Sequence, residues 1–187
     1  CAGRMDDPDM SAEAVKSGWI DLVSLGRPLL ADPDYVNKLR AGKLADIRPC
    51  IGCQEGCMGR IQNYSLINCA VNPQCARERD FAYTPVLRKK RVVIAGGGVA
   101  GMEAARVLAL RGHEPVLCER TGRLGGALGE AGVPSFKEDD RALIRRMRRD
   151  LVRGDALSVV DAVRLLRPDG SMITARVSAS AMRDARH

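Results

Sequence analysis

Aromatic residues are scarce in this sequence: one Trp, three Tyr and two Phe make up 3% of its 187 residues. Proteins that bind single-stranded nucleic acid usually interleave basic residues with aromatic side chains on which the bases stack. The net charge of +7 is spread along the chain without such interleaving. We therefore expect a soluble protein with a basic surface that binds no nucleic acid.

Long apolar runs are also lacking, so we expect no membrane-spanning helix and no membrane partner. The sequence begins with Cys1 and shows no signal-peptide pattern. A mature lipoprotein can begin with cysteine, but a piece cut from a longer chain is the interpretation that we favour. The length leaves room for one or two domains.

Cysteine, in contrast, is plentiful, with seven residues. An odd count clustered at ligand spacing argues against a disulfide scaffold and for a reducing compartment, which we take to be the cytoplasm. Three closely spaced thiolates and one more distant thiolate can close a four-sulfur site for an iron–sulfur cluster or a zinc ion. Zinc ribbons more often use two separated pairs, so we predict a [4Fe–4S] cluster. Zinc, or cysteines that are unligated or disulfide-bonded, are the alternatives. The predicted ligands are Cys50, Cys53, Cys57 and Cys69.

Residues 1–45 have the pattern of short β/α units. We predict a helix over residues 8–16, a strand over 19–25 and a helix over 29–39 that Pro33 interrupts. Gly26-Arg27 directly after the strand could bind an anion, although a turn glycine and a solvated arginine are the simpler interpretation. Residues 46–85 are loop-rich, with a short helix over 61–66, and a metal would stabilise them. Cys75 has the default interpretation of a small buried hydrophobic residue, although it could compete as a ligand.

Residues 86–128 carry the second strong signal. A basic linker precedes residues 92–95, which have the composition of a buried parallel strand. The glycine-rich run Gly96-Gly97-Gly98-Val99-Ala100-Gly101 follows, then an amphipathic helix over 102–111 and a strand over 116–119 that ends in an acid. This order of elements is the fingerprint of a dinucleotide-binding βαβ unit. We therefore predict a site for a dinucleotide or ADP.

Each fingerprint residue has a distinct expected role in that site. Gly96 makes the tight turn, Gly98 lets the backbone approach a pyrophosphate, and Gly101 lets helix and strand pack closely. Glu119 would bind the ribose, unless it is only a solvated acid at a strand end. A second glycine pair after this acid favours an FAD-type domain over a plain NAD-type domain. The further cofactor-binding candidates are Arg120, Gly125 and Gly126.

Residues 134–153 lead into a strongly basic helix in which Leu143, Met147 and Leu151 share one face. We expect its arginines, at positions 141, 145, 146, 148, 149 and 153, to form a solvated outer face. In the remaining residues, 154–187, we predict a turn at 168–170, a strand over 172–177 and a frayed end.

Taken together, these motifs resemble the iron–sulfur flavoenzyme branch of the old yellow enzyme family. That branch includes bacterial 2,4-dienoyl-CoA reductase, trimethylamine dehydrogenase and related NADH:flavin oxidoreductases. The resemblance covers roughly residues 1–152. The matching segments are Gly3-Arg4, residues 21–33, residues 47–53 with Cys57, residues 68–73, and the glycine fingerprint through Gly126.

The resemblance implies an α/β fold with four parts. Residues 1–45 would be the last β/α units of an FMN-binding (β/α)₈ barrel, 46–85 the [4Fe–4S] segment, 86–152 the FAD- or ADP-binding βαβ region, and 153–187 a tail of uncertain fold. Gly3, Arg4, Gly26 and Arg27 match the loops that hold the FMN phosphate in that family. Electrons would pass from NAD(P)H to FAD, then through the cluster to FMN, and finally to an activated double bond.

A whole barrel needs about 250 residues, so only its last part could be present. The family's substrate pocket and proton donors have no counterpart in this sequence, and we name no catalytic residue. We expect the rest of the barrel upstream, a small-molecule substrate of enoate or enoyl-CoA type, and no turnover by this chain alone; homo-oligomerisation stays open. The alternatives are an amine dehydrogenase or demethylase of the same build, an electron-transfer module without its own substrate site, and a non-catalytic or zinc-stabilised binding protein.

Overall fold

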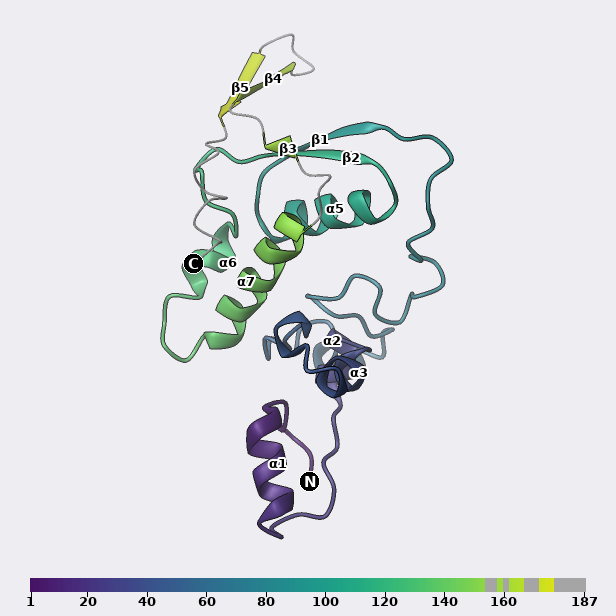
Figure 1. Cartoon of the computed structure of the whole chain (residues 1–187), viewed down its shortest axis with the longest axis vertical. Coiled ribbons are helices and arrows are strands. Elements are labelled where there is room, and N and C mark those ends of the chain that lie inside the picture. The colour runs from purple at the N-terminus through teal and green to yellow at the C-terminus, as the bar shows by residue number, and fades with distance from the viewer. Residues whose placement is uncertain (154–157, 160–161, 167–171, 177–187) are drawn as a thin grey trace. The chain divides into compact units, whose positions relative to one another are not determined.

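The computed structural model describes residues 1–153, 158–159, 162–166 and 172–176 of the chain (Figure 1). The chain divides into two compact units, Cys1–Ala82 and Tyr83–His187. The finer division into four parts stays a prediction. Within the described residues, no helix is both long and apolar enough to cross a membrane.

The first unit begins with helix α1, Pro8–Lys16, which has the predicted bounds. The Asp7 carboxylate caps it by accepting a 2.9 Å hydrogen bond from the Met10 N–H, and Pro8 fits the first turn, where a missing N–H costs nothing. On either side of α1, Ala2 and Ser24 form a parallel bridge. One backbone pairing therefore joins the two ends of this segment across α1, in the parallel sense of a β/α unit.

The predicted strand over residues 19–25 is wrong in extent, because only Ser24 pairs in this segment. Its side chains at Trp19 and Leu22 are 80% and 77% exposed. A parallel strand is normally covered on both faces, and these apolar side chains lack that cover among the described residues.

Short helices complete the first unit. The predicted break at Pro33 is confirmed, since it separates helix α2, Arg27–Ala31, from helix α3, Tyr35–Arg40. A single 3₁₀ turn, η1, spans Leu44–Asp46. The short helix that we predicted over residues 61–66 lies earlier, as α4, Met58–Gln62.

The second unit contains the predicted parallel βαβ fold. Strand β1, Arg91–Ala95, leads into helix α5, Val99–Leu110, and then into strand β2, Glu114–Cys118. The two strands pair in parallel, from Arg91 opposite Glu114 to Ala95 opposite Cys118. A short strand β3, Ser158–Val159, pairs in parallel with β2 and gives the sheet order β1-β2-β3.

The expected burial of β1 is wrong, whereas β2 is buried along most of its length. Residues Pro115–Cys118 are buried, but Val93 in β1 is 46% exposed and its neighbours alternate in burial. In the described sheet β1 is an edge strand, so one of its faces and one of its edges lack a partner there.

Helices α6, Ala127–Ala131, and α7, Glu138–Arg153, follow the sheet strands. Helix α5 packs on β1 and β2, and α7 packs on α5 and α6 (Figure 1). The predicted apolar face of α7 is confirmed, since Leu143, Met147 and Leu151 are at most 5% exposed. The expected solvated arginine face is wrong for Arg146, which is buried and pairs with Asp150 at 3.1 Å.

The last described elements are two antiparallel strands, β4, Ala162–Leu166, and β5, Met172–Arg176. Strand β5 confirms the predicted strand at this place. The predicted turn at residues 168–170 and the predicted frayed end lie outside the described residues.

Candidate functional site

The glycine fingerprint of the second unit joins β1 to α5. Gly96 has φ +105°, in the left-handed region that favours glycine, and its N–H donates to the Cys118 carbonyl at 2.7 Å. A Cβ on Gly101 would lie 1.9 Å from the Gly96 carbonyl oxygen, so helix and strand approach too closely for any side chain there. A Cβ on Gly98 would meet nothing within 4 Å. The backbone is therefore tightly packed at Gly101 and open at Gly98, as the predicted roles require.

Glu119 lies directly against this fingerprint. Its carboxylate accepts a 2.7 Å hydrogen bond from the Gly97 N–H, and its other oxygen accepts 2.8 Å bonds from the N–H and the hydroxyl of Thr121. Burial alone would raise the pKa of Glu119, but these hydrogen bonds outweigh it and hold the pKa below its ordinary value. Arg120 is exposed, and its charge favours the same ionised form. A carboxylate is thus fixed beside the glycine turn.

The second glycine pair closes on the first. The Gly125 N–H donates to the Gly97 carbonyl at 2.8 Å, and Gly125 forms a parallel bridge with Gly98. Gly126 has φ +55°, and a Cβ there would lie 3.1 Å from the Gly98 Cα. A larger residue at position 126 would therefore fill the space between the second glycine pair and Gly98. The five predicted glycines lie around one turn of the backbone, with the Glu119 carboxylate hydrogen-bonded to it, and we call these residues the glycine cradle. Backbone without side chains beside a carboxylate fits an adenine dinucleotide.

The predicted phosphate residues of the first unit also come together. Gly3, Arg4, Gly26 and Arg27 all line one cavity of about 230 Å³, whose wall also includes Cys50. Arg4 has φ +53° and its guanidinium lies 3.8 Å from the Asp6 carboxylate. Arg4 and Arg27 line this cavity together with Asp6, and arginine side chains suit a phosphate because each offers several charged N–H donors. The residues present therefore fit the FMN phosphate that the resemblance implies.

All seven cysteines are free thiols, so none of them forms a disulfide. Cys50, Cys57 and Cys69 are half-buried and Cys53 is exposed, where it lines a separate cavity of about 390 Å³. In the part of the chain that the structure describes, no three Cys, His, Asp or Glu side chains lie close enough to hold a metal ion. Four free thiols suit a cluster chemically, but their positions do not form a closed four-sulfur site.

Cys69 lies within electrostatic reach of Cys50 and of Cys75, and Cys57 lies within reach of Cys75. Burial raises the pKa of the Cys50 thiol, and interaction with Cys69 raises it further. Burial likewise raises the pKa of Cys75, as do Cys69 and Cys57 to a smaller degree. Cys75 is 3% exposed, which confirms its interpretation as a small buried residue.

Gly56 brings the two halves of the cysteine segment together. Its carbonyl accepts a 2.7 Å hydrogen bond from the Asn68 N–H, and a Cβ on Gly56 would lie 2.1 Å from Asn68 Oδ1. Gly56 precedes Cys57 and Asn68 precedes Cys69. This contact therefore brings the backbone segments that carry two of the predicted ligands next to each other. The glycine at position 56 is visible in the sequence, but its contact with Asn68 could not be predicted from it.

A buried polar network holds the same segment and was not predicted. The Asp32 carboxylate accepts hydrogen bonds from the Lys38 ammonium at 2.6 Å and from the Arg48 N–H at 2.7 Å. The Arg48 guanidinium donates to Asn72, whose amide donates to the Leu30 carbonyl at 2.9 Å. The polar residues beside each end of the cysteine segment could have suggested this network. Their partners could not be predicted, because the hydrogen bonds join residues 16 to 42 positions apart in the sequence.

Two family models match this chain. The model described as NADH:flavin oxidoreductase / NADH oxidase family matches residues 1–46, which hold the two-arginine cavity. The model described as FAD dependent oxidoreductase matches residues 91–180, which hold the glycine cradle. The two matches thus fall on the two predicted flavin sites.

Individual relatives agree with these matches. Cinnamate reductase of Clostridium sporogenes is 54% identical over 144 residues, which are 77% of this chain and 22% of the relative. The structure of 2-naphthoyl-CoA reductase with 2-naphthoyl-CoA has 29% identity and a TM-score of 0.77, over 98% of this chain and 26% of that one. Histamine dehydrogenase from Rhizobium sp. 4-9 has 28% identity and a TM-score of 0.76, over 84% of this chain and 24% of that one.

The chain therefore spans about a quarter of the length of the proteins that it matches. Both family models and these relatives are oxidoreductases, and the models name flavin as the cofactor. They confirm the predicted resemblance, the α/β class and the enzyme class. This chain is similar to the NADH:flavin oxidoreductase / NADH oxidase family over residues 1–46 and to FAD dependent oxidoreductases over residues 91–180.

Proposed function

We propose that this chain is part of an NAD(P)H-dependent flavin oxidoreductase that reduces an activated C=C bond. The observation that carries the proposal is that one chain has two groups of residues that would suit a flavin. The first unit has a cavity lined by Arg4 and Arg27, and the second has a glycine cradle closed by Gly125 and Gly126. A flavin bound at such sites supplies hydride and single-electron transfer.

The residues of the second unit would bind and orient the adenine end of FAD, or ADP. The open backbone at Gly98 would face the pyrophosphate at the start of α5, a helix of twelve residues. Glu119, held ionised between Gly97 and Thr121, would accept hydrogen bonds from the ribose hydroxyls. In the first unit, Arg4 and Arg27 would hold the FMN phosphate with Gly3 and Gly26 giving the backbone room.

We further propose Cys50, Cys53, Cys57 and Cys69 as ligands of a [4Fe–4S] cluster. Their support is four free thiols in one segment whose halves Gly56 and Asn68 bring together. Closing the site would require movement of side chains, chiefly of the exposed Cys53. Coupling between metal binding and folding makes such closure on metal uptake a normal behaviour of thiolate sites.

The substrate class that we propose is an enoate or enoyl thioester. Its support is the 54% identity to a protein named cinnamate reductase and the structural likeness to a naphthoyl-CoA reductase. The second candidate is an amine dehydrogenase, which the likeness to histamine dehydrogenase favours. The third candidate is an electron-transfer module without its own substrate site, because we assign neither of the two cavities named above to a substrate.

The nucleotide site is tested by calorimetric titration of the chain with FAD, ADP and NADH. We expect one FAD or ADP per chain, and a loss of affinity of about tenfold or more in Glu119→Gln, because a charge-assisted hydrogen bond is weakened. Glu130→Gln, at an exposed position of α6, is the matched control. A folded chain that ignores both adenine nucleotides would overturn the proposal.

The substrate class is tested on the intact gene product under anaerobic conditions. Consumption of NADH or NADPH that depends on cinnamate supports the reductase. Reduction of an artificial electron acceptor that depends on an amine, with no response to cinnamate, supports the dehydrogenase instead.

A further inference from the structure

Arg148 of helix α7 contacts the backbone of the second glycine loop. Its Nε donates a 3.1 Å hydrogen bond to the Leu124 carbonyl, and a second nitrogen of the same guanidinium donates to the same oxygen. The two residues lie 24 positions apart in the sequence, and Arg148 is half-buried. We call residues 124–126 the glycine-pair loop. The charged guanidinium of Arg148 thus donates two hydrogen bonds to one carbonyl of this loop.

The glycine-pair loop is held from both sides. On one side, the Gly125 N–H bonds to the Gly97 carbonyl of the fingerprint at 2.8 Å. On the other side lies α7: a Cβ on Gly125 would be 3.4 Å from Ile144 Cγ2 and 3.6 Å from a terminal nitrogen of Arg148. Gly125 itself is buried, with φ +124°. The glycine-pair loop therefore packs between the glycine fingerprint and helix α7.

We propose that Arg148 is a positioning residue for the adenine-nucleotide site. By holding the Leu124 carbonyl, it keeps Gly125 and Gly126 against Gly97 and Gly98, so that the cradle exists before the nucleotide arrives. A cradle that is formed in advance binds more tightly, because the ligand does not have to order the loop. The inference rests on the proposed function, since it concerns the same nucleotide site.

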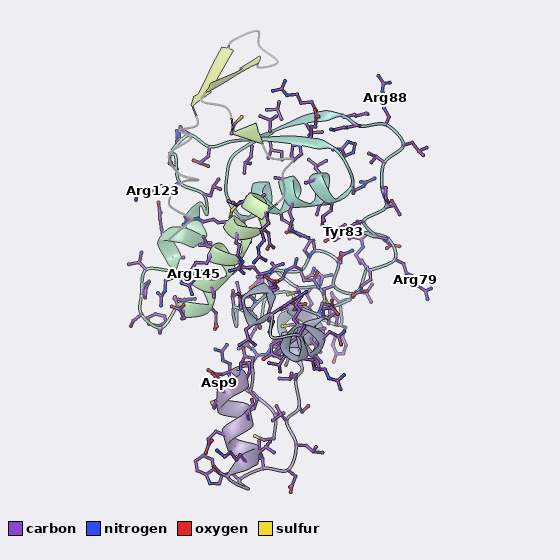
Figure 2. The ribbon with its side chains drawn as sticks, viewed as in Figure 1. Asp9, Arg79, Tyr83, Arg88, Arg123 and Arg145 are labelled. Atoms are coloured by element: carbon purple, nitrogen blue, oxygen red, sulfur yellow. The ribbon has the colours of Figure 1, made fainter. Side chains whose placement is uncertain are left out.

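The packing of α7 does not depend on Arg148. The helix is held on α5 and α6 by its apolar face, in which Leu143, Met147 and Leu151 are buried. Arg145 (Figure 2) offers a contrast on the same helix. It is exposed and pairs with Glu138 in the first turn. Loss of the Arg148 head group should therefore loosen the glycine-pair loop while the helix stays in place.

The test compares Arg148→Met, which keeps the length of the side chain and removes the donors, with Arg148→Lys and with the control Arg145→Met. Affinity for FAD and for ADP is measured by calorimetry. We expect R148M to weaken binding about tenfold, since it removes a hydrogen bond from a charged donor. R148K should recover part of that loss, and R145M should bind within about twofold of the original chain, as exposed substitutions usually do.

The second readout is amide hydrogen exchange of the peptide that covers residues 123–127. Faster exchange in R148M, but not in R145M, is the result expected of a loosened loop. Equal affinity and equal exchange in R148M would overturn the inference. If R148M does not fold, Arg148→Gln is scored by the same two readouts and the same criteria.

The two readouts also separate this inference from the function on which it rests. An original chain that binds neither FAD nor ADP removes the proposed nucleotide site, and with it the role of Arg148. An original chain that binds a nucleotide, with R148M unchanged, leaves the proposed site standing and removes only the role of Arg148.

Discussion

The Arg48 guanidinium donates a 3.0 Å hydrogen bond to Asn72 Oδ1, and this buried contact joins the two ends of the cysteine segment. Arg48 lies two residues before Cys50, and Asn72 lies three residues after Cys69. Both ends are also tied to the residues around α2, through Asp32 and the Leu30 carbonyl. A loop with few apolar residues is thus closed by polar contacts, independently of any metal.

Replacing Arg48 by Met should destabilise the first unit by about 1–3 kcal/mol, because it leaves the buried Asn72 amide oxygen without its charged donor. Urea unfolding and limited proteolysis of residues 46–85 measure the effect. Arg40→Met, at an exposed position on α3, serves as the control and should change little. Equal resistance of the two variants to protease would refute the role of the Arg48–Asn72 contact.

The stability of the first unit should fall in acid because of Asp32. Burial raises the pKa of this carboxyl, but hydrogen bonds from Lys38 and from the Arg48 N–H hold the pKa below its ordinary value. A carboxyl whose pKa is lower in the folded state stabilises the fold above its unfolded pKa, and this contribution is lost as the pH falls through the folded pKa. The stabilisation by Asp32 should therefore begin to fall at about pH 4 and continue to fall below it.

The urea midpoint, measured from pH 7 down to pH 2.5, checks this dependence on pH. Asp32→Asn should lower the midpoint at pH 7 and flatten the decline in acid. Asp9→Asn, on the exposed face of α1, is the control (Figure 2). A decline in D32N as steep as in the original chain would show that other carboxyls cause it.

Two glycines of the fingerprint should respond differently to alanine. Gly101→Ala would place a Cβ 1.9 Å from the Gly96 carbonyl oxygen, so we expect a loss of stability of about 1–3 kcal/mol or more. Gly98→Ala meets no atom within 4 Å and should leave the melting temperature nearly unchanged, while it weakens the binding of FAD or ADP. Thermal unfolding and nucleotide titration separate the two effects. Equal melting temperatures for both variants would contradict the close approach at Gly101.

Cys53→Ser should remove iron from the chain and make residues 46–85 more sensitive to protease, since a thiolate site contributes to folding only with its metal. Cys1→Ser, which also changes an exposed cysteine, is the control and should keep its iron. Iron analysis and timed proteolysis provide the measurement. Unchanged iron content in C53S would remove Cys53 from the ligand set.

Much of the second unit could be predicted because its signals are local. The turn at Gly96, the helix after it and the acid at Glu119 follow one another within 24 residues, and the structure places them as expected. The helix over residues 8–16 was equally clear, since Asp7 and Pro8 define its start. At helix α1 the contacting residues are sequence neighbours, and in the βαβ unit the fixed order of elements predicts the contact of Glu119 with the glycine turn across 22 residues.

The failures concern contacts between distant residues. The composition of residues 92–95 indicated burial, but the place of β1 in the sheet decides its exposure. Arginines on α7 appeared interchangeable in the sequence, whereas Arg146 is buried and Arg148 bonds to a loop 24 residues away. Cysteine spacing indicated a ligand set, yet spacing alone does not fix where the four thiols lie.

Iron and acid-labile sulfide content, with a visible spectrum, should be measured first on anaerobically purified protein. If this chain carries electrons between two flavin sites, it should contain about four irons and four sulfides, with a broad brown absorbance that dithionite bleaches. Stoichiometric zinc, or a folded chain without metal, would contradict the cluster and leave the glycine cradle of residues 96–126 as the basis of the function.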